Sequence, residues 1–388
     1  MKFFPLVWRN LLRRKIRTTF TVLSVFVAFV LFGILMTIRI AFSAGVAIAG
    51  ADRLMMMDKI SLINPLPLSY QSRIAMTPGV VDVTHANWFG GVYQDPKNFF
   101  ANMAVDPESW LRMYPEFQLP ADQKKAWIAD RTGAIVGIDT ATRFGWKLGD
   151  RVPLLGVIYR RPDGAPWEFT IDGIYTSTEQ AVDKTQFFFH WDYLNETLRN
   201  TAYGKDQVGW YVIRVKDPSQ SDTLAKRLDA MFANSPNETK TATEKAFVSS
   251  FASQIGDIGS IMIAISIAVL FTILLVSGNT MAQAIRERTN ELAILKTLGF
   301  GDGRILRLVL AESCVIALLG GVAGLAVSWA LVTFGKNPAL SMLPPFFLPI
   351  RDLVVGFAIV VALGLATGIL PAVQASRMRI VDALRRNG

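Results

Sequence analysis

Four long runs of apolar residues dominate the hydropathy pattern of the chain. They cover Thr18–Ile38, Ile258–Ile285, Ile305–Phe334 and Leu353–Ala375, and Glu312 is the only acidic side chain inside them. A helix that crosses a hydrocarbon core of ~30 Å needs about 20 such residues, because it rises ~1.5 Å per residue. A soluble core helix is seldom apolar on every face over this length. The pattern therefore predicts an α-helical membrane protein with four transmembrane helices.

The segment 43–255, between the first two runs, has the pattern of a folded domain. Phe169–Tyr175 and Val208–Lys216 alternate apolar and polar residues, as half-buried strands do. Asp217-Pro218 suits the N-cap and the first position of a helix. Shorter strand candidates are Val80–Thr84, Ala101–Val105, Ala134–Ile138 and Val152–Ile158. We expect an α+β domain in two subdomains, inserted between transmembrane helices 1 and 2.

Both connections between this domain and the apolar runs have helical features. Arg39–Met57 contains no proline, and Phe247, Phe251 and Ile255 recur every four residues as one stripe of a helix. Two interpretations are open. The stripe packs against the domain, or the spans continue outward as stalk helices that carry motion.

The distribution of charge sets the orientation in the membrane. The net charge is +9, and fifteen Lys and Arg against four Asp and Glu lie in 1–17, 286–307 and 377–388. Cytoplasmic segments carry such an excess, so both termini and the central loop are expected in the cytoplasm, with 43–255 outside. We interpret the basic composition as a topology signal and expect no nucleic-acid partner. A signal peptide cleaved near Ala47–Ala49 is the alternative, but the first run is longer than a usual signal core.

These patterns together predict the organisation of a multi-pass protein of the bacterial cytoplasmic (inner) membrane. Its expected parts are a cytoplasmic amphipathic N-terminal helix (1–17), transmembrane helix 1 (18–42), the extracytoplasmic, periplasmic α+β domain with helical stalks (43–255), transmembrane helix 2 (256–285), a cytoplasmic loop (286–304), transmembrane helix 3 (305–334), a short external loop (335–352), transmembrane helix 4 (353–375) and a cytoplasmic tail (376–388).

The central loop is the most informative stretch. Leu292, Leu295 and Leu298 recur every three residues, Glu291 lies beside them, and Gly299 suits a helix C-cap. The pattern predicts a short helix with an apolar stripe at the membrane face. Such a helix either rests on the bilayer surface or enters the groove of a partner.

Residues that carry chemistry are scarce. The sequence contains no G-x-x-x-x-G-K-[ST] phosphate loop, and Gly299–Gly303 lacks the lysine and the preceding strand of one. His85 and His190 have no metal-ligand spacing, and Cys314 is the single cysteine. We expect no catalytic site, no metal site and no cofactor in this chain.

Small residues and one acid mark the third and fourth runs. Gly320, Gly321 and Gly324 lie together, and Gly364 and Gly368 form a G-x-x-x-G. Small residues at this spacing let helix backbones approach closely, so we interpret these glycines as packing positions. An acid inside a membrane span is costly unless it is paired or hydrated. Glu312 is therefore a functional candidate or a capping acid near the cytoplasmic face.

Three stretches of the sequence resemble the FtsX-like, MacB-type permeases of ABC transporters, which include the lipoprotein-releasing permeases. The first is the N-terminus from Trp8 to Thr18. The second runs from Arg286 through Gly299 and Glu312-Ser313 to Gly324. The third runs from Pro371-Ala372 through Ala375-Ser376-Arg377 to Ala383-Leu384-Arg385. The usual Arg-Glu-Ile of the loop is Asn290-Glu291-Leu292 here, which keeps the carboxylate.

The resemblance implies a type VII ABC architecture. Two permease chains, either identical or paralogous, work with two copies of a separate cytoplasmic ATPase that binds ATP and Mg. The residues that would couple to that ATPase are Arg288, Glu291, Leu292, Leu295, Leu298 and Gly299. The family acts on membrane lipid, lipoproteins or toxic compounds, in some cases with a periplasmic adaptor. The alternative function is a non-transporting mechanical regulator of an extracytoplasmic partner, such as a cell-wall hydrolase.

Overall fold

A computed structural model describes residues 8–10, 13–48, 50, 52–61, 63–179, 182–201, 205–254, 258–334 and 347–378. The chain divides into two compact units. The membrane unit contains residues 1–40, 258–335 and 346–388, and the outer unit contains residues 41–257 and 336–345. The predictions for the first seven residues, Ile255, most of the external loop and the end of the tail lie outside the described residues.

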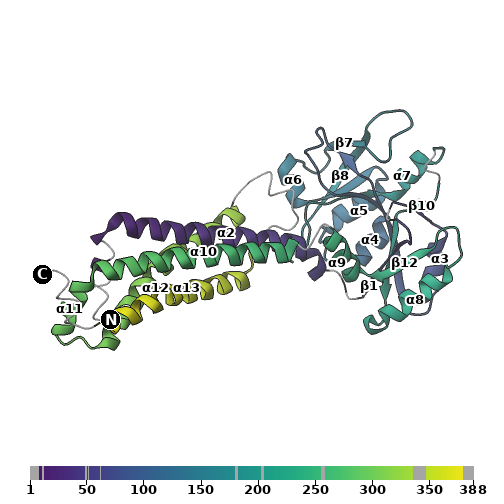
Figure 1. The fold of residues 1–388 in the computed structure, drawn as a ribbon. Coiled ribbons are helices and arrows are strands. Elements are labelled where there is room, and N and C mark those ends of the chain that lie inside the picture. The colour runs from purple at the N-terminus through teal and green to yellow at the C-terminus, as the bar shows by residue number, and fades with distance from the viewer. Residues whose placement is uncertain are drawn as a thin grey trace. The chain divides into compact units, whose positions relative to one another are not determined.

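Within the described residues, four helices are long and apolar enough to cross a membrane, by length and composition. They are α2 (Lys15–Ile48), α10 (Ile258–Glu287), α12 (Asp302–Phe334) and α13 (Ile350–Ser376), as Figure 1 shows. A short helix, α11 (Thr289–Thr297), connects α10 to α12. The prediction of four membrane-spanning helices is confirmed.

The helices of the membrane unit pack through small residues. An added side chain at Gly320 or Gly324 of α12 would lie 2.6 Å from a backbone oxygen of α2. At Gly364 of α13 it would lie 2.9 Å from Cys314 of α12, and Gly321 and Gly368 lie at the same α12–α13 contact. In lipid, where burial from water does not drive association, this close approach supplies the packing. The five glycines therefore lie between helices of one chain.

The outer unit is built on one mixed sheet of ten strands, in the order β12-β1-β11-β3-β5-β9-β6-β8-β7-β4. Its pairs are antiparallel except β5 with β9 and β6 with β8. The strands are β1 (Arg53–Asp58), β3 (Val80–Trp88), β4 (Gly91–Val92), β5 (Asn102–Val105), β6 (Gly133–Gly137), β7 (Arg151–Gly156), β8 (Trp167–Tyr175), β9 (Phe187–His190), β11 (Trp210–Val215) and β12 (Thr239–Thr243). A separate ribbon pairs β2 (Leu66–Pro67) with β10 (Gln207–Val208).

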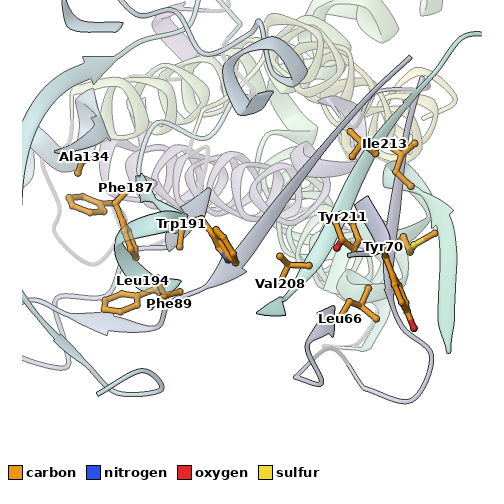
Figure 2. Close-up of a cluster of buried hydrophobic side chains, with 14 of the residues drawn as sticks. Leu66, Tyr70, Phe89, Ala134, Phe187, Trp191, Leu194, Val208, Tyr211 and Ile213 are labelled. Carbon is orange, nitrogen blue, oxygen red and sulfur yellow. The ribbon is translucent and has the colours of Figure 1, made fainter. Parts of the chain in front are cut away.

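Helices pack on both faces of this sheet. The larger core lies under α3 (Tyr70–Ala75), α6 (Ile138–Phe144), α7 (Trp191–Leu198) and α8 (Ser221–Met231). Figure 2 shows Tyr70, Trp191 and Tyr211 among its side chains. The smaller core lies under α4 (Pro107–Met113) and α5 (Ala121–Ala129), around Trp110 and Trp127. A last helix, α9 (Glu244–Gln254), follows β12. The expected α+β architecture is confirmed.

The alternation of apolar and polar residues predicted a strand correctly where one face of that strand is buried. In β8, side chains at odd positions from Trp167 to Tyr175 are buried and the intervening ones are exposed or half-buried. The predicted helix start at Asp217 is also confirmed, because its side chain accepts the Ser219 amide and caps a 3-10 turn, Pro218–Gln220, before α8.

Three expectations about the outer unit are wrong. It does not divide into two subdomains, because the sheet is continuous and residues 41–257 form one compact unit. The chain after the first span is not helical as far as Met57, since α2 ends at Ile48 and β1 starts at Arg53. The proposed strand end at Ile138 is instead the first residue of α6.

Candidate coupling site at the connection between α10 and α12

The short helix α11 ends through a backbone motif that its sequence encodes. Gly299 has a φ of +90°, in the left-handed region that favours glycine. Its amide donates to the Lys296 carbonyl at 3.0 Å, and the Phe300 amide donates to the Leu295 carbonyl at 3.1 Å. These two bonds form a Schellman motif, which satisfies the last carbonyls of the helix. The chain therefore turns sharply into α12.

The leucine stripe of α11 does not form one free apolar face. Leu292 is fully buried against α10, α12 and α13, and Leu295 is partly buried at the same contact. The exposed apolar side chains are Leu298, at 71%, and Ile294, at 53%. The sequence spacing identified a short helix but assigned Leu292 and Leu295 to a partner groove, whereas they anchor α11 to its own bundle. The face open to a partner carries Ile294 and Leu298.

Glu312 is buried and paired. It is 3% exposed, and Arg288 Nη1 donates to both of its carboxylate oxygens, at 2.8 and 3.1 Å. Asn10 Nδ2 donates to Oε1 at 2.7 Å. The side chain thus joins three segments, from the N-terminus, the end of α10 and the first half of α12. Arg288, which the family resemblance implies as a coupling residue, thus directs its guanidinium toward this buried acid.

The N-terminal arginines pair with the acids of the loop. Arg14 and Arg17 contact Glu287 at 2.9 and 2.7 Å. Arg13 forms an ion pair with Glu291, and Arg288 Nε lies 3.6 Å from the same carboxylate. Single exposed pairs contribute about 0–1 kcal/mol, but a set that shares partners fixes register. The basic N-terminal segment therefore contacts the connection between α10 and α12 through these ion pairs.

Lys296 connects α11 to the end of α13 and to the start of α12. Its ammonium donates to the carbonyls of Ser376 at 2.7 Å and Met378 at 2.8 Å, and it pairs with Asp302 at 2.8 Å. A cation at the C-terminal end of α13 satisfies carbonyls that the helix leaves unpaired. Sequence analysis missed this role, because the contact joins residues 80 positions apart. α11 is thus tied to α2, α12 and α13.

A small cavity with a mixed polar and apolar lining lies beside the Arg288–Glu312 pair, within the membrane unit. Its volume is about 40 Å³, enough for about three waters by the volume that one water needs. Hydroxyl groups of α2, α10, α12 and α13 line it, from Thr21, Thr280, Ser313 and Thr367. A charge pair next to such a cavity can be hydrated when it separates. The geometry therefore allows the pair to rearrange without exposing bare charges to hydrocarbon.

The remaining candidate residues lie away from this site. His85 and His190 are buried in the outer unit, where His85 Nδ1 lies 2.9 Å from Gln71 Oε1 and His190 Nε2 lies 2.6 Å from the Trp127 carbonyl. Burial lowers the pKa of both rings, that of His85 to about 4. Cys314 lies in α12 at the α13 contact. Among the described residues, no group of three metal-ligating side chains is placed to hold an ion.

Comparison with known proteins matches one segment near the C-terminus, which is less than a third of the chain, to a family model. Residues 262–380 match the family described as FtsX-like permease C-terminal. The match covers α11, most of α10 and the whole of α12 and α13, and so contains the coupling site apart from the N-terminal arginines.

Several curated proteins are similar to this chain. An uncharacterized ABC transporter permease, YknZ, of Bacillus subtilis is 26% identical over half of this chain and 49% of its own length. The macrolide export ATP-binding/permease protein MacB of Chromobacterium violaceum is 27% identical over 49% of this chain and 30% of its own length. The chain thus spans half or less of these two relatives.

A solved structure is also similar to part of the chain. The extracellular domain of the ABC-type transporter YknZ from Gram-positive bacteria is matched over 99% of its length and 49% of this chain, with 10% identity and a TM-score of 0.35. That score is too low to carry an argument by itself. Four apolar helices, the α/β outer unit and the matched domain describe a multi-pass membrane protein. Residues 262–380 of the chain therefore form a domain that matches the FtsX-like permease C-terminal family.

Proposed function

We propose that this chain is the permease subunit of an ABC transporter and works with a separate cytoplasmic ATPase. The observation that carries the proposal is α11. This helix presents Ile294 and Leu298 outward while its other side is tied to three membrane helices. A helix that is exposed on one face and packed on the other can bind a soluble ATPase and transmit its movement to the membrane helices.

Docking of the ATPase would bury the two exposed side chains. Burial of apolar surface contributes about 25 cal/mol per Å², and Glu291, half-exposed at the edge, would set register with a basic group of the groove. Movement of α11 would then act on Arg288 and Glu312, and through the N-terminal arginines on α2. Because α2 is one continuous helix from Lys15 to Ile48, displacement at its start reaches its far end.

The proposal includes both termini in the cytoplasm and the outer unit outside. It also includes a second permease chain and two ATPase copies, as the family resemblance implies. The work done is export or extraction of a lipid, a lipoprotein or a toxic compound. The basic excess of the assigned cytoplasmic segments supports this orientation. A cysteine placed at Gly164, an exposed turn of the outer unit, should react from outside the cell, whereas one at Asn387 should react only after permeabilisation.

The docking role is tested by co-purification of the ATPase with Leu298→Asp, which places a charge on the open face. We expect loss of the ATPase from the purified complex. The matched control, Leu298→Met, keeps the apolar surface and should retain it. Leu295→Asp is a poor test, because Leu295 also packs inside the bundle. If Leu298→Asp retains the ATPase and its stimulated turnover, α11 is not the docking element.

A further inference from the structure

The outer unit contains an apolar cavity of about 580 Å³. Strands β3, β5 and β11 contribute Trp88, Met103 and Trp210, helix α7 contributes Trp191 and Leu194, and α9 contributes Phe247. Figure 2 shows Trp191 and Leu194 among the buried side chains of the larger core. Cavities of ~300–1,000 Å³ that are mostly apolar are typical of small-molecule sites. All lining residues belong to the outer unit, so the cavity does not depend on the proposed coupling.

The lining carries no charge. None of its residues is Asp, Glu, Lys, Arg or His, although charged residues make up 18% of the chain. A second cleft of the same unit, about 690 Å³ in volume, is instead lined by Asp82, Asp106, Arg112 and Asp192. An ion that left water for the first cavity would find no opposite charge there, and this desolvation is costly. The lining therefore selects against ionic ligands.

Several polar groups of the lining are already engaged with the protein. Asn87 Nδ2 donates to the Tyr159 hydroxyl and to the Gln207 carbonyl, both at 3.4 Å. The Asn195 side chain donates to Asp206 Oδ1 at 3.1 Å and accepts the Asp206 amide at 2.8 Å. Asn87 Oδ1 is buried without a hydrogen-bond partner among the described residues and can accept one bond from a ligand, whereas the rest of the recognition relies on shape and on contact with the aromatic rings.

The cavity opens onto apolar side chains that are exposed. Ile63 is 88% exposed and Ile158 is 39% exposed, and Trp88 is stacked on Phe99 with ring centroids 6.4 Å apart. Contiguous apolar surface of this kind on a soluble domain marks a site of interaction. Its continuity with the cavity indicates the route by which a lipophilic molecule leaves water.

We propose that this cavity binds an uncharged, ring-bearing lipophilic molecule. The test is photolabelling of the full chain in lipid nanodiscs with 3-trifluoromethyl-3-phenyldiazirine, followed by peptide mapping with mass spectrometry. The matched probe is the para-carboxylate of the same diazirine. We expect the neutral probe to label the α7 peptide saturably. The carboxylate should label it about tenfold less, because desolvation of its charge costs at least the ~1.4 kcal/mol that a tenfold difference in binding represents.

Two neighbouring substitutions test the place of binding. Ile158→Asp puts a carboxylate at the opening, whereas Val157→Asp puts one on an exposed residue outside the lining. Labelling of α7 by the neutral probe should fall on the order of tenfold in the first variant and stay unchanged in the second. Ile158→Asn keeps the shape of Asp without the charge and should lose less.

Unchanged circular dichroism across the three variants shows that loss of labelling is not loss of fold. Equal labelling of α7 by the neutral and carboxylate probes would overturn the proposal. So would equal effects of Ile158→Asp and Val157→Asp, or labelling that follows the charged cleft around Arg112 rather than α7.

Discussion

Each unit of the molecule contains a buried arginine–glutamate pair, and the two pairs have different surroundings. In the outer unit, Arg53 Nε contacts Glu244 at 2.6 Å and its Nη2 contacts Glu116 at 2.9 Å. Glu244 also accepts the Tyr114 hydroxyl at 3.0 Å and the Gly50 amide at 2.9 Å. In the membrane unit, the Arg288–Glu312 pair borders a cavity, and Arg288 Nε has no hydrogen-bond partner among the described residues.

The Arg53–Glu244 pair is held in one arrangement by its surroundings, whereas the Arg288–Glu312 pair can rearrange. Arg53 begins β1 and Glu244 begins α9, so their pair fastens the first and last elements of the sheet-bearing unit. Every contact holds it in one arrangement. The Arg288–Glu312 pair lies where α10 turns into α11, with Glu291 as a second acid within 3.6 Å of Arg288 and with room for water. A pair with an alternative partner and solvent nearby can change partner at low cost.

The largest effect on stability is expected from removal of Glu244, the acid of the buried pair in the outer unit. Glu244→Ala leaves Arg53 buried with one partner fewer, which lowers the free energy of unfolding by about 3–5 kcal/mol. Glu312→Ala should cost about 1–2 kcal/mol, because Glu291 and water can take up Arg288. Thermal unfolding of the full chain in detergent measures both. The control is Glu238→Ala, which breaks an exposed pair with Lys59 and should change little.

Equal losses for Glu244→Ala and Glu312→Ala would contradict the comparison, since both pairs would then be structural.

Sequence reasoning found the four spans, the short helix between α10 and α12 and several elements of the outer unit, but neither pair. The four spans and β8 follow from periodicity, which is a local signal. β1 was missed because every residue of Arg53–Asp58 is buried, so the segment shows no alternation, and methionine does not favour strands. β9 was missed for the same reason, since all of Phe187–His190 is buried.

The pairs were missed because they join distant positions. Arg53 and Glu244 are 191 residues apart, and Asn10 and Glu312 are 302 apart. No window along one sequence contains both partners. The three-residue spacing of Leu292, Leu295 and Leu298 predicted a helix, but spacing alone does not tell which side packs on the protein's own bundle. The coupling roles proposed for these residues stay predictions.

A smaller effect is expected from the glycine contacts of the membrane unit. Gly324→Ala places a methyl group 2.6 Å from the Phe26 carbonyl oxygen, so α2 must shift, at a cost of about 1–3 kcal/mol. Gly278→Ala in α10 meets nothing within 4 Å and should be neutral or stabilising, because alanine favours a helix. The thermal midpoint of each variant in detergent is the measurement. A Gly324→Ala midpoint at or above that of Gly278→Ala would remove the close-packing role.

The smallest effect concerns Asp172, an acid of the outer unit that forms no ion pair with the residues that the structure describes. Burial, with the charge of Asp130 nearby, raises the pKa of Asp172 to about 6 from its usual 3.8. The folded state therefore holds this proton more tightly, so its contribution to stability is present below pH 3.8 and is lost as pH rises to 6. The low pKa of His85 acts in the opposite direction, with stability lost as pH falls from 6.5 to 4.

Asp172→Asn should stabilise the chain above pH 6 by about 1 kcal/mol. This is less than the pKa shift of Asp172 alone would give, because the carboxyl group is only partly buried. At pH 4 the variant and the parent should unfold at nearly the same temperature. Unfolding midpoints at pH 4 and pH 7 give the comparison. Destabilisation at pH 7 would show that the ionised carboxylate has a favourable partner.

We propose that Arg288 and Glu312 act as one unit between the ATPase and the membrane helices. This proposal is tested by ATP turnover of the reconstituted complex in nanodiscs, with Arg288→Met, Glu312→Gln and the double variant. We predict that each single variant keeps the bound ATPase but loses most of the stimulated turnover, and that the double variant is no worse than either, because residues that work as a unit are not additive. Full turnover in the single variants, or losses that add in the double variant, would show that Arg288 and Glu312 do not act as one unit.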